Sequence, residues 1–347
     1  MSQLSSHLFK TIRDLIEKSK ESVVRNINTT MLLTYFEIGK TIVTDEQNGK
    51  NRAEYAKETL RNLSRQLSKE FGRGYSVDNL QWMRKFYLTF QGRVIEKYET
   101  LSRISFTDPN YETLSRISLF SLSWSHYIQL MKIDNEDERN FYEIEAEQNN
   151  WSVRELTRQY NSAIYERLAL SKDKEGMKQL AQKGQIIEKP TDVLKSHYVL
   201  EFLDLKQDSR YSESELETQI INKLEHFMLE LGKGFLFEGR QRRFTFEGDS
   251  FFVDLVFYNR LLKCFVLFDL KIGKLTHQDI GQMQMYVNYY DRKIKLETEN
   301  PTIGIILCKE ENKTVIEFTL PENNNTIFAK EYKAILPSKD ELKQQIG

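Results

Sequence analysis

The chain has 347 residues, of which 39% are hydrophobic, 12% aromatic and 29% charged, with a formal net charge of −1 at pH 7. This composition excludes a disordered chain, and the length predicts two or three domains. The balanced charge excludes a uniformly basic protein, so binding to a nucleic acid would require local basic patches.

The two cysteines, Cys264 and Cys308, lie in apolar runs typical of buried strands and lack the spacing of a zinc site or a disulfide framework. The first twenty residues are polar and helical in pattern, unlike a signal peptide. No apolar run approaches the length of a membrane span. We therefore expect a cytoplasmic protein with no membrane partner.

The first half of the chain is predicted to be helical. Apolar residues recur at helical spacing in residues 4–38 and 55–71, and the second run ends at Gly72-Arg73-Gly74, which has the chemistry of a helix stop. Ser76 is suited to cap a helix over residues 77–90, and another helix is expected at 135–149. Residues 98–105 and 111–118 are near-identical copies, which we interpret as a local duplication in an exposed loop or hairpin.

Residues 51–97 are the most basic part of this half, with ten basic and five acidic side chains. The order of helix, glycine turn and helix suggests a helix-turn-helix, with residues 76–90 as the recognition helix. Its candidate nucleic-acid contacts are Arg73, Arg84 and Lys85. The alternative is an ordinary helical hairpin with solvated charges.

The pattern changes after residues 171–195, a polar, lysine-bearing stretch that is the best linker candidate. It would separate a helical domain of residues 1–170 from a second domain of residues 196–347. In the second domain, helices are predicted at 214–231 and 276–290, and strands at 235–243, 251–259, 264–271, 302–308 and 315–318. The predicted fold class is α+β, with a helical N-terminal domain and an α/β C-terminal domain built on a mixed sheet.

Three charged residues interrupt two of these apolar strands: Asp254 in the second, and Asp269 and Lys271 in the third. Such charges are costly in a buried strand unless they are paired or bind a metal. Period-two alternation places Asp269 and Lys271 on one face, and antiparallel pairing through the short connection at 259–263 could bring Asp254 beside Asp269. Two carboxylates can bind Mg²⁺, or Mn²⁺ as an alternative, which lowers the pKa of a bound water, while Lys271 positions that water or stabilises the transition state.

Other side chains could complete this site. Glu217 on the preceding helix is a candidate third metal ligand, and Gln282 and Tyr286 lie one turn apart on the following helix, where they could hold the metal's water shell and contact the phosphate. A basic run before the second strand could contact phosphates through Arg240, Arg242 and Arg243. The alternatives are a buried salt-bridge network for the strand charges, a solvated Glu217, a core role for Tyr286 and a charged edge strand for the arginines.

These residues resemble the PD-(D/E)XK nuclease superfamily through residues 252–255, Asp269-Leu270-Lys271 and a Gln-x-x-x-Tyr helix at 282–286. Nearly the whole chain is more closely similar to the bacterial YhcG-like family, and the matching segments are 71–76, 83–87, 122–127, 151–156, 231–235, 238–241 and 281–283. The resemblance implies an N-terminal domain like a DNA-binding winged helix and a restriction-endonuclease-like C-terminal domain. Two departures are Val253, where the superfamily has proline, and Asp269, where it more often has glutamate.

We therefore expect a magnesium-dependent nuclease that hydrolyses phosphodiester bonds in DNA. One alternative is a non-catalytic nucleic-acid-binding or adaptor protein on a nuclease fold, and another is an RNA-directed nuclease. The sequence leaves a homo-oligomer open, together with the substrate structure and the polarity of cutting.

Overall fold

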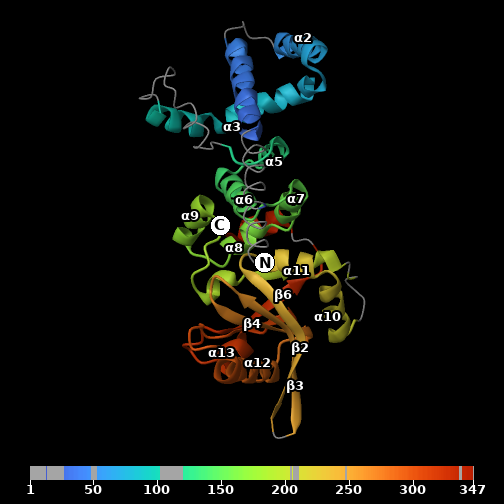
Figure 1. Ribbon diagram of the computed structural model, residues 1–347, viewed down its shortest axis with the longest axis vertical. Coiled ribbons are helices and arrows are strands. Elements are labelled where there is room, and N and C mark those ends of the chain that lie inside the picture. The colour runs from blue at the N-terminus through green and yellow to red at the C-terminus, as the bar shows by residue number, and fades with distance from the viewer. Residues whose placement is uncertain are drawn as a thin grey trace, which may run out of the picture. The chain divides into compact units, whose positions relative to one another are not determined.

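The structure is a computed structural model that describes residue 13 and residues 27–47, 53–101, 120–203, 205, 211–246, 248–335 and 338–346 (Figure 1). The chain divides into two compact units. The first comprises Met1–Arg139 with Ala146–Leu156, and the second comprises Asn140–Glu145 with Thr157–Gly347. Each unit is described by itself below.

The first unit is helical in its described residues. Residues 27–47 form a helix, followed by α2 (Ala53–Phe71), a 3₁₀ turn (Arg73–Tyr75), α3 (Val77–Leu101) and α5 (Trp124–Leu130). Helices α6 (Glu136–Gln148) and α7 (Val153–Asn161) each cross the division between the units. Leu80 and Met83 of α3 pack against Ile42 and Leu60.

The predicted start of the third helix is confirmed, because the Ser76 hydroxyl accepts a hydrogen bond from the Asn79 N–H at 3.3 Å. Gly72 has a φ of +90°, a backbone conformation that favours glycine, at the predicted stop of α2. Most of the duplicated stretch at 98–118, and most of the predicted helix before residue 27, lie outside the described residues.

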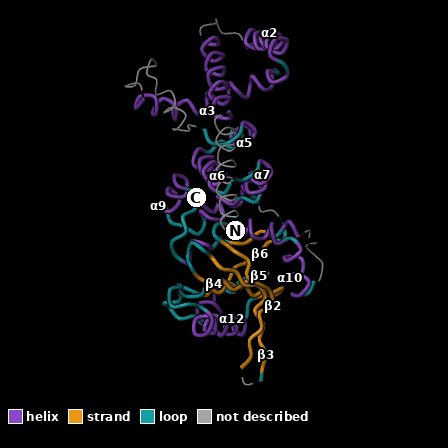
Figure 2. The backbone as a smooth tube through the Cα atoms, in the orientation of Figure 1, coloured by secondary structure: helices purple, strands orange, loops and turns teal. Residues whose placement is uncertain are grey.

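The second unit contains a six-stranded mixed sheet, drawn in orange in Figure 2. The strands are β1 (His197–Val199), β2 (Phe235–Phe246), β3 (Asp249–Asn259), β4 (Cys264–Lys274), β5 (Ile303–Glu310) and β6 (Ile327–Lys333), in the spatial order β1-β6-β5-β4-β3-β2. Strands β2, β3 and β4 pair antiparallel, and β4, β5, β6 and β1 pair parallel. The predicted α+β class with a mixed sheet is therefore confirmed.

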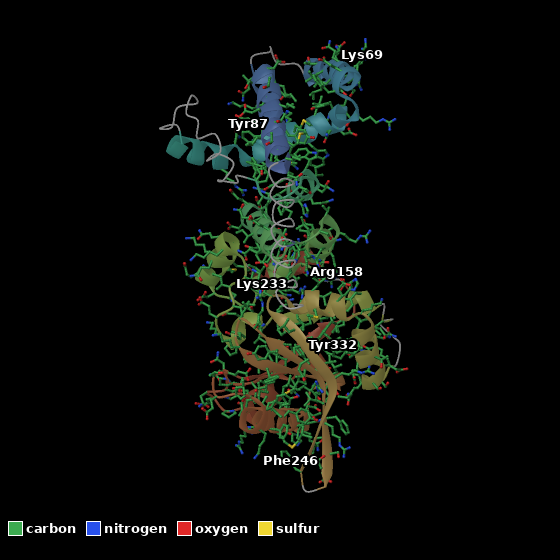
Figure 3. All side chains as sticks on the ribbon, viewed as in Figure 1. Lys69, Tyr87, Arg158, Lys233, Phe246 and Tyr332 are labelled. Atoms are coloured by element: carbon green, nitrogen blue, oxygen red, sulfur yellow. The ribbon has the colours of Figure 1, made fainter. Side chains whose placement is uncertain are left out.

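Helices cover both faces of this sheet. Helices α10 (Glu213–Asn222) and α11 (Leu224–Leu231) bury Leu216, Ile220 and Phe227 against one face, beside Phe257 and Phe268 of the sheet. Helix α12 (His277–Tyr289) buries one stripe against the other face, beside Val256, Leu267 and Ile306. Strands β2 and β3 continue past the helices as a two-stranded ribbon, with Phe246 on its distal part (Figure 3).

The remaining helices of this unit are α8 (Ile164–Ala169), α9 (Lys174–Lys183), α13 (Lys313–Thr319) and α14 (Lys339–Ile346). Short 3₁₀ turns occur at Pro190–Val193 and Glu201–Leu203, and a π-helical turn at Tyr290–Ile294 follows α12. The stretch 171–195 contains α9, in which Leu180 and Ala181 are buried. The predicted domain boundaries stay a prediction.

Two of the secondary-structure elements predicted from the sequence were wrong. Residues 315–318 lie in α13 and not in a strand, because the Asn312 side chain accepts the Val315 N–H at 3.3 Å and caps a helix. The helix predicted at 214–231 is two helices that meet at Lys223, where φ is −120° and ψ is 36°. Within the described residues, no helix has both the length and the apolar character that crossing a bilayer demands.

Candidate active site where β3 and β4 cease to pair

Strand pairing places Asp254 opposite Asp269. The β3–β4 register runs from Asn259 opposite Cys264 to Leu255 opposite Phe268, so the next pair along is Asp254 and Asp269. The regular ladder stops there, and Asp254 Oδ2 accepts the backbone N–H of Leu270 at 2.8 Å. The two carboxylates are therefore held at one point, where the two strands cease to pair.

The pKa values of both aspartates are raised above those of ordinary carboxyl groups. Burial raises the pKa of Asp254, against the opposing effects of the Leu270 N–H and of Lys271. Burial, and then the charge of Asp254, raises the pKa of Asp269 to about 7, although Lys271 opposes this. The side chain of Asp269 is only 2% exposed. A buried carboxylate beside a half-buried one creates an unmet demand for positive charge.

Lys271 meets part of that demand. Its Nζ lies 2.9 Å from Asp269 Oδ2, 3.7 Å from Glu213 of α10 and 4.0 Å from Asp279 of α12. Burial alone would lower the pKa of Lys271, but Asp269, followed by Glu213 and Asp254, raises it above the ordinary value. The lysine is a fixed cation at all physiological pH values, and it stands between the two helical layers.

Glu217 reaches the site from α10 through a glutamine. Gln241 Nε2 donates to Glu217 Oε2 at 2.5 Å and to Asp254 Oδ1 at 3.0 Å. Burial raises the pKa of Glu217, Gln241 lowers it, and the charge of Asp254 raises it again. Glu217 is thus a buried carboxylate at the site rather than a solvated helix residue.

Sequence reasoning missed Gln241. It lies among arginines on an edge strand, where side chains usually face solvent, and only its position opposite Asp254 in the β2–β3 pairing could have indicated a role. Its φ of +47° is rare for a residue with a side chain.

The predicted salt-bridge alternative accounts for part of the cluster. Asp269 and Lys271 form an ion pair, but within the described ranges no lysine or arginine lies at ion-pair distance from Asp254 or Glu217. Asp269 Oδ2 also lacks a well-aligned hydrogen bond despite its buried position. A closed network of pairs would leave neither carboxylate without a basic partner.

Gln282 and Tyr286 lie together on α12, as their spacing predicted. The Gln282 amide donates to the Tyr286 hydroxyl, and Tyr286 is 1% exposed and packs edge-on against Phe244. Burial, opposed by Gln282 and reinforced by Asp269 and Asp254, raises the pKa of Tyr286. Tyr286 is therefore a core aromatic residue whose hydroxyl is influenced by the charges of the two aspartates. Gln282, one helical turn earlier, is half-buried.

The start of α12 is fixed by a capping box. Thr276 Oγ1 accepts the Asp279 N–H at 3.4 Å, and Asp279 Oδ2 accepts the Thr276 N–H at 2.8 Å. This helix end carries Asp279 to within 4.0 Å of Lys271.

The three arginines of the basic run are all exposed on β2. Arg242 Nε bonds Glu238 at 3.0 Å, and Arg243 Nε donates to Ser250 Oγ at 3.1 Å on the paired strand. The charge of Arg240 lowers the pKa of Glu217, so Arg240 is the arginine electrostatically coupled to the acidic cluster.

The basic residues predicted in the first unit lie on the surface of α3 and the turn before it. Arg73 and Lys85 are exposed, and Lys85 Nζ lies 5.7 Å from the Trp82 ring centroid. Arg84 Nε bonds Glu46 at 2.7 Å. The structure gives these residues helical positions and local partners, and their contact with nucleic acid stays a prediction.

The donor chemistry suits a hard divalent cation. Glu217, Asp254 and Asp269 offer only oxygen ligands, which Mg²⁺ and Mn²⁺ prefer. Glu217 and Asp254 share one amide group, so their facing oxygens are no farther apart than the sum of two hydrogen bonds. No three His, Cys, Asp or Glu side chains of the described segments are gathered as a ready-made metal cage. The oxygen donors suit a hard cation whose remaining positions would be filled by water.

Comparison with known proteins agrees with this geometry. The profile of a family described as "YhcG PDDEXK nuclease domain" matches residues 191–347, and that of the "DUF1016 N-terminal domain" matches residues 11–167. The chain is 40% identical over 344 residues to "Putative nuclease YhcG" of Escherichia coli (strain K12), a match that covers 96% of this chain and 91% of that protein.

Among solved structures, a repair endonuclease from Pyrococcus abyssi is similar with a TM-score of 0.26 and 16% identity, over 38% of this chain and 50% of that one. A structure titled "EndoMS-dsDNA2 complex" gives 0.27 and 13%, over 39% and 51%. Because both scores are low, the assignment rests on the sheet topology, the acidic site and the full-length relative. The chain belongs to the YhcG family of PD-(D/E)XK nucleases.

Proposed function

We propose that this nuclease cuts DNA in a reaction that depends on Mg²⁺, with Mn²⁺ as a working substitute, and that its active residues are Asp254, Asp269 and Lys271. The observation that carries the proposal is the buried Asp269 beside the half-buried Asp254, next to a lysine that also contacts acidic residues of two helices. A buried group of this composition is typical of catalytic sites that stabilise anionic phosphate.

Each side chain has a distinct task in this proposal. Asp254, Asp269 and Glu217 are the oxygen donors that would hold the cation. When bound, the cation supplies a water of lowered pKa and neutralises charge on the phosphate. Lys271 holds the attacking water in line or stabilises negative charge on the phosphate, and its raised pKa keeps it protonated for that role. Gln282 contributes a hydrogen bond to the water shell or the phosphate from α12.

We assign nucleic-acid contacts to two regions. Arg240, Arg242 and Arg243 on β2 would bind phosphates close to the acidic cluster. The helical first unit would recognise DNA as a helix-turn-helix, through Arg73, Arg84 and Lys85 on and before α3. The two unpaired, buried thiols favour a reducing compartment, and we keep the cytoplasm as the expected location.

A cleavage panel tests the proposal directly. Linear, nicked, branched and single-stranded DNA, and a matched RNA, would each be incubated with the full chain in Mg²⁺, Mn²⁺ or EDTA. We expect cleavage of at least one DNA in Mg²⁺ or Mn²⁺ and none in EDTA. DNA binding without turnover in any divalent ion would instead support the non-catalytic adaptor, and cleavage of RNA alone would support the RNA-directed nuclease.

A further inference from the structure

Gln241 lies between Glu217 and Asp254, and the roles proposed above for the acidic residues do not explain why a glutamine is there. We propose that Gln241 is a ligand of the divalent cation, through its side-chain carbonyl oxygen, and that its amide nitrogen holds this place between Glu217 and Asp254 until the cation arrives. The inference rests on the proposed metal dependence of the site, and it names a ligand outside the acidic set.

The distances support a ligand position. In an octahedral Mg²⁺ site with metal–oxygen distances of about 2.1 Å, neighbouring ligand atoms lie about 3 Å apart. Gln241 Nε2 lies 2.5 Å from Glu217 Oε2 and 3.0 Å from Asp254 Oδ1. The end of the glutamine side chain therefore lies close enough to one oxygen of each carboxylate that all three residues could hold the same cation.

The change between the two states is small. A half-turn about the last side-chain bond exchanges the amide nitrogen for the carbonyl oxygen and leaves the other heavy atoms in place. Without a cation, the NH₂ group must face the carboxylates, because an oxygen there would be repelled. With a cation, the carbonyl oxygen is the better group, since amide carbonyls are accepted ligands of hard divalent ions. No bond forms or breaks in the protein, and no proton moves.

The backbone is irregular around Gln241, an exposed residue whose side-chain amide contacts Glu217 and Asp254. Gln241 adopts a φ of +47°, and the β2–β3 register shifts between Phe237 and Gly239, so that Glu238 is an extra residue in β2. Arg242 bonds Glu238 across this bulge. Left-handed backbone in a residue with a side chain is unfavourable and is concentrated at functional sites.

A purely structural role would use the same hydrogen bonds, so the test must separate a bridge from a ligand. Mn²⁺ binding to the full chain can be followed by electron paramagnetic resonance, because the signal of free Mn²⁺ falls as the ion binds. The informative variants are Gln241→Leu, which removes the amide but keeps an uncharged side chain of similar bulk, and Gln241→Glu, which keeps an oxygen at the end of a side chain of the same length. The control is Gln284→Leu, at an exposed glutamine of α12.

We expect Gln241→Leu to weaken Mn²⁺ binding by at least about tenfold, because even residues behind a metal's ligands cost that much when removed. Gln241→Glu should bind at least as tightly as the wild type, and Gln284→Leu should be unchanged. Melting in EDTA and in Mn²⁺ gives a second readout. Gln241→Glu should melt lower than the wild type in EDTA, since it adds a fourth carboxylate to Glu217, Asp254 and Asp269, and its melting temperature should rise more than that of the wild type when Mn²⁺ is added.

Equal or tighter Mn²⁺ binding by Gln241→Leu would overturn the inference, since Gln241 would then be a bridge that competes with the ion. Weaker binding by Gln241→Glu would overturn it as well. If the wild type cleaves DNA but binds Mn²⁺ no more tightly than Gln241→Leu, only the ligand role of Gln241 is overturned and the proposed function stands. A wild type that binds no Mn²⁺ would remove the proposed function itself.

Discussion

At the scale of single residues, Asp269 is the carboxylate of the site whose pKa is raised to near neutral. Burial and the neighbouring Asp254 raise its pKa from 3.8 to about 7. The pKa of this carboxyl is higher in the folded state than in the unfolded state, so its protonated form stabilises the fold. That stabilisation is complete below about pH 4, compared with neutral pH. That contribution is lost as the pH rises through about 7. The loss is on the order of 4 kcal/mol and is shared with Asp254, because the two groups titrate together.

Replacement of this carboxyl by a neutral amide should therefore stabilise the metal-free protein. In EDTA, we expect Asp269→Asn to resist urea better than the wild type at about pH 8, with a difference that shrinks toward about pH 5. The Asp249→Asn variant, on the exposed start of β3, should show no such trend. A pH-independent difference, or a less stable Asp269→Asn at the higher pH, would show that Lys271 already compensates the charge.

The contrast between Asp254 and Gln241 shows what a sequence can disclose about a site. Asp254, Asp269 and Lys271 could be placed together from their strands alone, because alternation and a short connection fix the register of an antiparallel pair. Gln241 could not, because its role depends on a left-handed backbone and a bulge, which no periodic pattern encodes. The part of Glu217 stayed undecided in the sequence for a similar reason, since a helix residue's partner is set by packing.

At the scale of elements, the site depends on how closely α12 lies on β5. Gly304 of β5 faces this helix, and a Cβ added there would lie 2.5 Å from Met283 Sδ and 2.9 Å from Val287 Cγ2. Glycine at this position therefore allows α12 to approach the sheet. The same helix carries Gln282, Tyr286 and Asp279 to the acidic cluster.

The same substitution at two glycines should consequently have opposite effects. Gly304→Ala should push α12 away from β5, lower the melting temperature by several degrees, and reduce cleavage. Gly281→Ala, inside α12 with nothing within 4 Å of the added Cβ, should stabilise the chain by up to about 1 kcal/mol. Thermal melts of the two variants test this, and a Gly304→Ala protein as stable as the wild type would contradict it.

The elements that the sequence failed to predict share a physical cause. β1 has only three residues, and β6 mixes lysines and a glutamate into its apolar positions, so neither has a clear alternating pattern. Both are strands because they complete the sheet: β6 pairs parallel with β5, and β1 pairs parallel with β6. Residues 315–318 are apolar enough for either state, and the Asn312 cap decided for a helix.

At the scale of the molecule, a buried ionic cluster ties distant parts of the second unit together. Arg167 of α8 bonds Glu230 of α11, with Nη2 to Oε2 at 3.2 Å, and Lys195 Nζ lies 3.7 Å from Glu230 Oε1. All three side chains are fully buried. Burial would raise the pKa of Glu230, but Arg167 and then Lys195 lower it to about 2. The glutamate is therefore a buried anion held chiefly by Arg167, because burial lowers the pKa of Lys195 to about 7.

This cluster predicts how much chain the nuclease domain requires. A fragment of residues 191–347, the span of the family profile, loses Arg167 and leaves Glu230 with one cation, a loss worth about 3 to 5 kcal/mol. A fragment of residues 140–347 keeps Arg167, and also Glu145, which bonds Lys233 at 2.8 Å.

Circular dichroism melts would compare the two fragments. We expect a cooperative transition for residues 140–347 and a weak or absent one for residues 191–347. The full chain carrying Arg167→Met should be destabilised by a comparable amount, which separates loss of the arginine from truncation. Equal melting temperatures of the two fragments would place the domain boundary nearer to residue 191.

The most direct test of the whole account is Mg²⁺-dependent DNA cleavage by a matched set of variants, each first shown to melt like the wild type. Asp254→Asn and Lys271→Met should lose at least about a hundredfold in rate. Lys274→Met should cleave normally, because Lys274 lies on the same strand but is exposed and pairs with Glu310 at 3.2 Å. Undiminished cleavage by both Asp254→Asn and Lys271→Met would contradict the placement of the active site where β3 and β4 cease to pair.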